Sequence, residues 1–200
     1  MAEVSAGLVV FRLTRSDEPR TPAGGMPTEP APPRGAHPGA NDRPPGARAA
    51  APPEPPHRSP APALEVLCGH MGGPFWARKD ERAWSFPKGV IEHGEEPLAA
   101  ARREFAEELG RTAPPGEYRR LGEYRYASGK VVVLYAVEAD LVIDEVRSTT
   151  FEMEWPPRSG QLRAFPEVDR AAWFDLPTAR GKLVAGQAPA LDDLAHLVGR

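Results

Sequence analysis

The sequence predicts an α+β domain, and three observations support this fold class. Residues 4–13 form a short apolar run rich in β-branched side chains, which is typical of a buried strand. Residues 97–109 have the apolar periodicity of one amphipathic helix. Further strand-like runs follow this helix, and two short helical segments come last. A chain of 200 residues suits one domain with a sizeable core.

The first strand is followed by an abrupt change of composition. Residues from about 16 to 62 hold fifteen of the 25 prolines and almost no aliphatic or aromatic side chain beyond alanine. Such a segment cannot bury enough apolar surface to offset the entropy of ordering, so we expect a disordered, proline-rich insert in a single domain that spans residues 1–200. It is either a tolerated insertion or a docking tail for proline-binding modules.

The remaining elements are expected in a regular order. The run ALEVLCGH resumes a strand directly after the insert, so the insert is expected to interrupt a hairpin, at a loop-closure cost of about 2 kcal/mol. A short strand at 83–87, the helix at 97–109, strands at 118–126, 130–143 and 171–174, and helices at 177–183 and 189–198 follow.

The helix at 97–109 has clear boundaries and an apolar stripe. Pro97 lies in the first turn, where a missing N–H does no harm, and Gly110 is a favoured left-handed C-terminal cap. The stripe recurs at spacings of three and four residues, at Leu98, Ala101, Phe105 and Leu109, so this side of the helix should face a core.

Three glutamates lie along one edge of that stripe. Glu104, Glu107 and Glu108 fall within about 100° of one another around the helix. Like charges at these spacings repel by a few tenths of a kcal/mol per pair, and one arginine, Arg103, cannot neutralise them all. Clustered carboxylates without histidine or cysteine are hard ligands, which favours Mg²⁺ or Mn²⁺. A solvated helix face is the simpler interpretation for any one of them alone.

The segment from Gly89 to Gly110 resembles the Nudix box. Gly89, Glu95 and the run REFAEELG from Arg103 onward have its spacing, and only Arg111 departs from it, since an aliphatic residue is usual there. The pieces GGPFWARKD, WSFPKG, FEMEWPPRSG and FPEVDRAAWFDL also resemble a little-characterised group of bacterial Nudix proteins described as predicted pyrophosphohydrolases. The resemblance implies a mixed β-sheet sandwiched between helices, an α/β/α arrangement.

The same resemblance implies a metal site and a hydrolytic reaction. Its metal ligands would be Glu104, Glu107 and Glu108, with the backbone carbonyl of Gly89 as a further candidate. The implied substrate is a nucleoside diphosphate linked to another group, cleaved at a phosphoanhydride bond. Such a reaction needs cations to offset phosphate charge and a water placed in line with the leaving oxygen.

Several residues are candidates for proton transfer and its support. Glu104 is the first choice for the general base, and Glu167 is the alternative, although a surface residue before a strand is an equally good interpretation of Glu167. Arg103 is expected to orient Glu107 or Glu95. Glu95 is expected to support the ligands or to bind the cation through water.

Substrate contacts are expected from the loops before the box. Lys88 could contact a phosphate oxygen, and Trp76 with Arg78 could contact a base or a polyphosphate tail. Trp76 and Trp84 could equally be packing residues, and Trp155 is as ambiguous.

Other titratable and aromatic residues receive structural interpretations. His70 and His93 flank the site region. A histidine base is the alternative, but loop histidines without a placed partner are more often incidental, and this is the interpretation we favour. Cys68 is expected to be a buried packing residue. Trp173 is expected in the core.

The leading functional prediction is a Mg²⁺-dependent pyrophosphohydrolase that prefers dinucleoside polyphosphates. Nucleoside triphosphates, nucleotide sugars and diphosphoinositol polyphosphates are alternative substrates, and a non-catalytic Nudix sensing module is the alternative class. A net charge of -3 disfavours bulk nucleic-acid binding. With one cysteine, no signal sequence and no apolar run of about 18–20 residues, we expect a cytoplasmic protein that is not inserted in a membrane.

Overall fold

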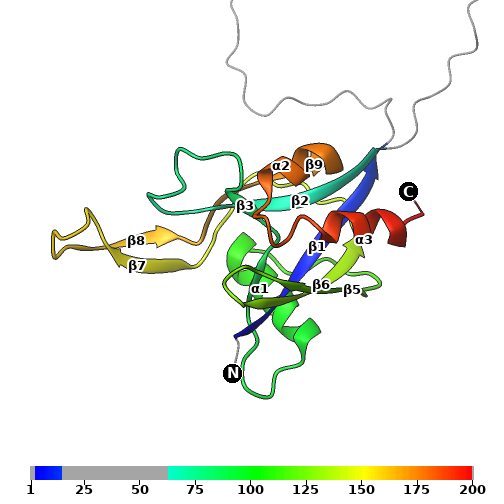
Figure 1. Cartoon of the computed structure of the whole chain (residues 1–200), viewed down its shortest axis with the longest axis horizontal. Helices are drawn as coiled ribbons and strands as arrows, with labels where there is room; N and C mark the ends of the chain where they lie inside the picture. Colours follow the sequence, from blue (N-terminus) through cyan, green and yellow to red (C-terminus); the bar gives the residue numbers. More distant parts are fainter. Residues whose placement is uncertain (1–2, 15–62, 200) are drawn as a thin grey trace, which may run out of the picture. The chain divides into compact units, whose positions relative to one another are not determined.

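The computed structural model describes residues 3–14 and 63–199 of the chain (Figure 1). Its strands are β1 (Val4–Thr14), β2 (Ala63–Met71), β3 (Trp84–Ser85), β4 (Lys88–Val90), β5 (Arg119–Arg125), β6 (Val131–Glu138), β7 (Thr150–Glu154), β8 (Leu162–Pro166) and β9 (Val168–Asp175). Its helices are α1 (Pro97–Leu109), α2 (Leu176–Lys182) and α3 (Ala190–Leu197). No helix in this part of the chain is long and apolar enough to cross a membrane.

The main sheet is mixed, as predicted. It has the path β3-β2-β1-β6-β5, with β4 also paired to β1 and β9 to β2. Strands β1 and β6 run parallel, whereas the other pairs are antiparallel. Strands β7 and β8 form a separate two-stranded hairpin that projects from the main sheet (Figure 1).

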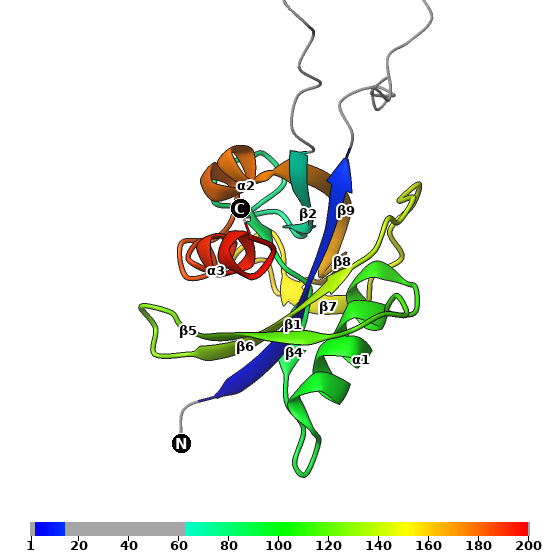
Figure 2. The ribbon, with the colours of Figure 1, turned by 90° about the vertical axis from the view of Figure 1, so that its right-hand side faces the viewer.

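Helices cover both faces of the main sheet, because β1 directs alternate side chains to opposite sides. Ala6, Leu8 and Val10 are buried with apolar residues of α1, whereas Val9 and Phe11 are buried with residues of α2 and α3. Figure 2 shows α1 on one side of the strands and α2 and α3 on the other. The predicted α/β/α arrangement is confirmed.

Helix α1 has the predicted boundaries. Pro97 lies at its start, and Gly110, with φ 69°, ends it by donating its N–H to the carbonyl of Ala106 at 2.9 Å. Phe105 and Leu109 on the predicted stripe are buried. The helix therefore packs on β1 through the side that its sequence predicted.

Strands β1 and β2 form the hairpin that the sequence predicted. Phe11 lies opposite Val66, and Thr14 lies opposite Ala63, in an antiparallel register. The proline-rich segment, and the docking role considered for it, lie outside the described residues. Cys68 on β2 is fully buried, and burial raises the pKa of its thiol, so its predicted packing role is confirmed.

Three strand predictions were wrong in detail. The expected strand at 83–87 is shorter, with only Trp84 and Ser85 in β3, and an unpredicted strand, β4, begins at Lys88. The chain passes from β2 to β1 at Pro87, whose carbonyl accepts the N–H of Leu8 at 3.0 Å. The expected strand at 130–143 ends at Glu138, where its pairing with β1 ends opposite Phe11. The last strand is longer than expected and begins at Val168. The hairpin β7–β8 was not predicted.

Candidate active site

Arg103, in the middle of α1, joins three carboxylates. Its Nε and Nη2 donate to the two oxygens of Glu95 at 3.0 and 2.9 Å. Its Nη1 donates to Glu104 at 2.7 Å and to Glu107 at 3.2 Å. The Nη2 also donates to the carbonyl of Val90 at 3.0 Å, which fixes the guanidinium against the loop. Arg103 thus contacts both acids that the sequence predicts it to orient, and Glu104 as well.

Two of the three acids of α1 are buried. Glu104 is 9% and Glu108 is 6% exposed, whereas Glu107 is partly open to solvent. Burial raises the pKa of Glu108 to about 7, although the charge and the backbone N–H of Lys88 favour its ionised form. Burial also raises the pKa of Glu104, against the opposing effect of Arg103. Both carboxylates lack enough positive charge to offset their loss of solvation.

The strand before α1, β4, approaches Glu104 closely at Gly89. A methyl group on the Cα of Gly89 would overlap the carboxylate of Glu104. Strand β4 fixes this position, since Gly89 lies opposite Ala6 of β1. Glycine is therefore required there, and its backbone lies directly against this carboxylate.

The acids of α1 face a pocket of about 580 Å³. Glu104, Glu107 and Glu108 line it together with Lys88 and Glu167. Among the described residues that line this pocket, Lys88 is the one cationic side chain. The pocket is thus strongly acidic and would attract a cation before it attracted an anionic substrate.

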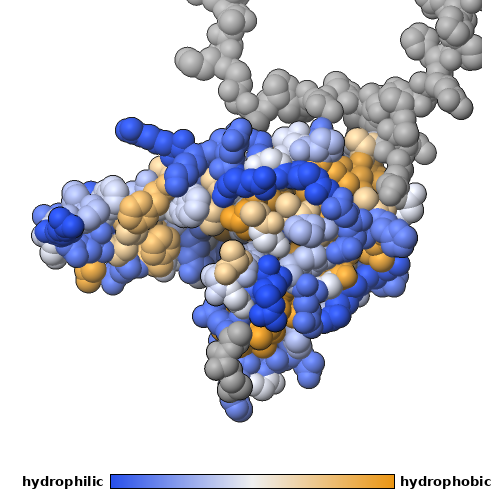
Figure 3. Space-filling view, in the orientation of Figure 1, coloured by the Kyte–Doolittle hydropathy of each residue, from blue (hydrophilic) through white to orange (hydrophobic). Residues whose placement is uncertain are grey.

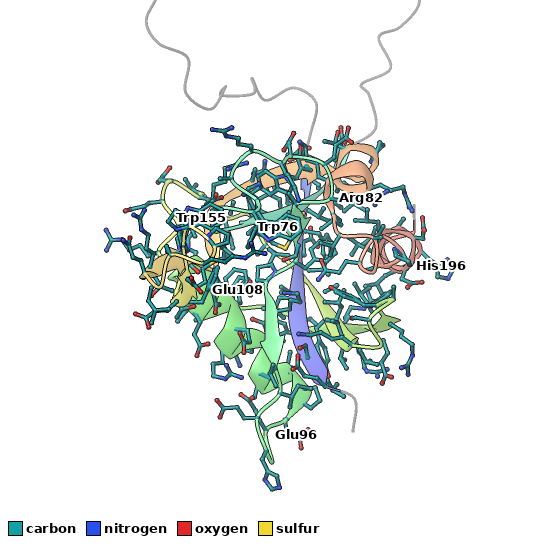
Figure 4. The ribbon with its side chains drawn as sticks, turned by 60° about the vertical axis from the view of Figure 1, so that its left-hand side comes forward. Trp76, Arg82, Glu96, Glu108, Trp155 and His196 are labelled. Carbon is teal, nitrogen blue, oxygen red and sulfur yellow. The ribbon has the colours of Figure 1, made fainter. Side chains whose placement is uncertain are left out.

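Of the other residues considered for substrate contact, the structure places some on the pocket wall and others away from it. Trp76 lines the pocket, and Figure 4 shows it on the same side of the molecule as Trp155, above Glu108. Arg78 is exposed and is not among the lining residues. Trp84 is only 4% exposed, so it is a packing residue.

Comparison with known protein families identifies the family to which this chain belongs. The family model described as NUDIX domain matches residues 66–194. The chain belongs to the Nudix family. Over 48 residues it is 46% identical to the RNA pyrophosphohydrolase of Photobacterium profundum and 44% identical to that of Vibrio cholerae serotype O1. These matches cover 24% of this chain and only 28% of each relative.

Solved structures confirm the Nudix fold. The Ap4A hydrolase of C. elegans, in a binary complex, has a TM-score of 0.50 and 17% identity and covers 98% of both chains. The NUDIX domain of Shewanella oneidensis NrtR, complexed with ADP ribose, has a TM-score of 0.53 and 14% identity and covers 99% of this chain and 89% of that one. At such identities the likeness concerns the fold alone.

The donor atoms of the Nudix box suit a hard divalent cation, as in the family, because they are all oxygens. Within residues 3–14 and 63–199, however, no three acids, histidines or cysteines gather closely enough to hold an ion. Arg103 takes one oxygen from Glu104 and another from Glu107. A cation that bound these two acids would therefore compete with the guanidinium.

Glu167 is brought to the Nudix helix by Gly72 and Thr149, which no sequence pattern singles out. Gly72 donates its N–H to the carbonyl of Glu167 at 2.8 Å, and Glu167 donates its own N–H to the carbonyl of Thr149 at 2.9 Å. The hydroxyl of Thr149 donates to the Glu167 carboxylate at 3.1 Å, and its N–H donates to the carbonyl of Glu107 at 2.9 Å. Thr149 thus links α1 to Glu167. No local pattern around Thr149 indicates this role.

Phe75 and Phe151, which the sequence did not single out, add to the aromatic residues on this side of the pocket. Phe151 of β7 lines the pocket, and the exposed Phe75 packs edge-to-face on Trp155 with ring centroids 5.4 Å apart. Figure 3 shows apolar residues along the projecting hairpin, where Leu162 is 68% exposed. Its sequence, FEMEW, alternates in the manner of a strand, which is the signal that could have identified β7.

Three remaining predictions concern single residues. His70 was expected in a loop, but it lies on β2 and is fully buried, so this prediction was wrong. His93 is exposed. Trp173 is partly buried against the core on the α1 side, with its indole N–H donated to the carbonyl of Leu141 at 3.0 Å.

Proposed function

We propose that this Nudix protein is a divalent-cation-dependent pyrophosphohydrolase that cleaves a phosphoanhydride bond in a nucleoside diphosphate linked to another group. The observation that carries the proposal is the burial of Glu104 and Glu108 at the wall of one pocket. Buried carboxylates without sufficient positive charge lower the stability of the folded state. A cation held there would remove this cost.

The proposed roles follow the geometry of the pocket. Glu104, Glu107 and Glu108, with the backbone of Gly89, would hold Mg²⁺ or Mn²⁺. The cation would neutralise phosphate charge and make a bound water more acidic. Lys88 would contact a phosphate oxygen as a point charge, because it is the cationic group on the pocket wall.

Proton transfer is assigned to a carboxylate on the pocket wall. Glu104 is the preferred general base, because its raised pKa makes the ionised carboxylate a stronger proton acceptor. Glu167 is the alternative, and its hydrogen bond from Thr149 would hold it in one orientation. Arg103 would keep Glu104 in place, and Glu95 would keep Arg103 in place through its two hydrogen bonds.

The preferred substrate is a dinucleoside polyphosphate, a small molecule with two bases. The resemblance of the WSFPKG stretch supports this choice, and Trp76 and Phe151 on the pocket wall are suitable contacts for a base. Arg78 would have to approach from the exposed loop to contact such a substrate. Because the curated relatives are named RNA pyrophosphohydrolases, the 5′ end of RNA is a second candidate.

A phosphate-release screen tests the proposal. Dinucleoside polyphosphates, 5′-triphosphorylated RNA, nucleoside triphosphates, nucleotide sugars and diphosphoinositol polyphosphates are each offered with Mg²⁺ or Mn²⁺. Glu104→Gln and Glu108→Gln are expected to lower turnover at least about a hundredfold. Glu96→Gln is the matched control, because Glu96 is exposed, makes no capping hydrogen bond and lies away from Glu108 (Figure 4).

The outcomes separate two classes of protein. Turnover of one substrate class that is lost in both site variants and kept in the control supports the hydrolase. Tight, cation-dependent binding of a substrate without any turnover would reject the hydrolase in favour of a sensing module.

A further inference from the structure

His70 is a fully buried imidazole, and both of its ring nitrogens face oxygen acceptors. Its Nδ1 lies 2.8 Å from Oδ1 of Asp169 on β9, and its Nε2 lies 2.8 Å from the backbone carbonyl of Lys79. A carbonyl and an ionised carboxylate have no proton to donate, and a neutral imidazole has only one. The arrangement therefore requires a second proton, either on the ring or on the carboxyl group.

The surroundings of Asp169 favour the ring as the site of this proton. Arg170 brings its guanidinium within 3.3 Å of the same Asp169 oxygen, so this carboxylate already takes part in an ion pair. Asp169 is also partly open to solvent, whereas His70 is not. A buried imidazolium is tolerated when it is paired and hydrogen-bonded, and both conditions hold here.

The other charged groups near the imidazole of His70 lie on the far side of Trp84 or on the loop between β2 and β3. The ring of Trp84 meets His70 edge-on at 5.0 Å between centroids. Arg170 and Lys182 lie over this indole at 5.2 and 5.8 Å. Asp80 on the loop accepts the indole N–H of Trp84 and pairs with Lys182. These groups are engaged with each other, so Asp169 is the charged group that contacts the ring directly.

The bond to Lys79 fixes the loop that carries Trp76. The N–H of Lys79 donates to the carbonyl of Trp76 at 2.7 Å, and the ammonium group of Lys79 lies over the indole of Trp76 at 4.6 Å. The N–H of Trp76 in turn donates to the carbonyl of Gly73 at 3.2 Å. Trp76 lines the pocket, so a chain of contacts joins His70 to the pocket wall.

We propose that His70 is a positioning residue: as an imidazolium paired with Asp169, it fixes the backbone at Lys79 and thereby places Trp76 on the pocket wall. When the ring loses its second proton, one of its two oxygen partners is left without a donor, and the loop is held less firmly. The effect of this on substrate binding rests on the proposed function, whereas the hold on the loop does not.

The variant Asp169→Asn separates the contact between this side chain and His70 from the need for a second proton on the ring. A carboxamide at this position donates to Nδ1, so a neutral ring satisfies both contacts and still donates to the carbonyl of Lys79. The variant therefore keeps the contact and removes the need for a second proton. His93→Asn is the matched control, because His93 is an exposed histidine elsewhere in the chain.

Two measurements on the full-length protein test the proposal without any substrate. Nitrogen NMR of the imidazole rings at about pH 6 should show both nitrogens of His70 protonated in the wild type and only Nε2 protonated in Asp169→Asn. Hydrogen exchange of the Trp76 and Lys79 amides, divided by the intrinsic rate, should lose about tenfold in protection as the pH rises in the wild type. This loss should persist in His93→Asn and be absent in Asp169→Asn.

Other results would overturn the proposal. A singly protonated His70 ring in the wild type at about pH 6 would show that the proton lies elsewhere. An equal pH dependence of loop protection in the wild type and in Asp169→Asn would show that His70 does not control the loop. With a substrate in hand, KM should rise with pH in the wild type and not in Asp169→Asn, at similar kcat. Absence of turnover with the expected NMR and exchange results would reject the proposed function alone.

Discussion

Replacing Glu108 with glutamine is expected to stabilise the metal-free protein above neutral pH, although the same change should abolish catalysis. Glu108 is 6% exposed, and its contacts to protein donors are limited to the N–H of Lys88 at 3.3 Å among the hydrogen bonds of the described residues. A neutral carboxamide of nearly the same shape can occupy this position without the cost of a buried charge.

The size of the effect follows from the pKa of Glu108. Burial raises this pKa from the ordinary 4.5 to about 7 in the folded chain. Between these pH values the unfolded chain releases a proton that the folded chain keeps, so the free energy of unfolding falls as the pH rises and stays lower above about 7. At about 1.4 kcal/mol for each tenfold change in proton affinity, the full loss is about 3 kcal/mol.

Urea unfolding at about pH 5 and about pH 8, with a chelator present, measures this loss. The wild type and the exposed-site control Glu96→Gln should both lose stability between the two pH values. Glu108→Gln should lose about 2.5 kcal/mol less, because the unfolded chain has already released most of this proton at about pH 5. Glu104, whose pKa is also raised by burial, accounts for part of any remaining decline. An equal decline in Glu108→Gln and in the wild type would refute the buried-charge explanation.

Three further predictions address Gly89, the binding of a divalent cation, and the buried side chain of Gln187. Gly89→Ala should push the carboxylate of Glu104 aside and abolish turnover, whereas Gly181→Ala, where no neighbouring atom lies within 4 Å, should leave turnover unchanged. Saturating Mg²⁺ or Mn²⁺ should raise the melting temperature of the wild type, because a ligand that binds only the folded state stabilises it, and Gly89→Ala should lose this rise. Gln187→Leu should lower the free energy of unfolding by about 1–2 kcal/mol in urea titrations, because the buried N–H of Phe86 loses its acceptor at 2.8 Å.

Local signals in the sequence were sufficient to predict the two ends and the buried side of α1. Pro97 and Gly110 set the two ends of α1 through backbone properties of single residues, and the structure has the same boundaries. The spacing of Phe105 and Leu109 identified the buried side of that helix. The single-domain organisation with its proline-rich insert stays a prediction.

Contacts between distant segments could not be predicted in the same way. The strand expected at 83–87 is confined to Trp84 and Ser85, because the chain leaves β2 there and pairs with β1 from Lys88 onward. Trp76 and Trp84 were indistinguishable by type and by neighbourhood in the chain. Only the packing of β3 against β2 and β9 buries Trp84 and leaves Trp76 on the pocket wall.

The sequence by itself determined the family, the fold class, the acidic edge of α1 and the loop glycine beside it, because each depends on residue type at a fixed spacing. The tertiary structure decided which acids are buried, that Thr149 holds Glu167 near them, and that His70 lies between two acceptors. Burial and hydrogen-bond partnership are properties of all the segments that surround a side chain. They are defined only when strands far apart in the chain have paired.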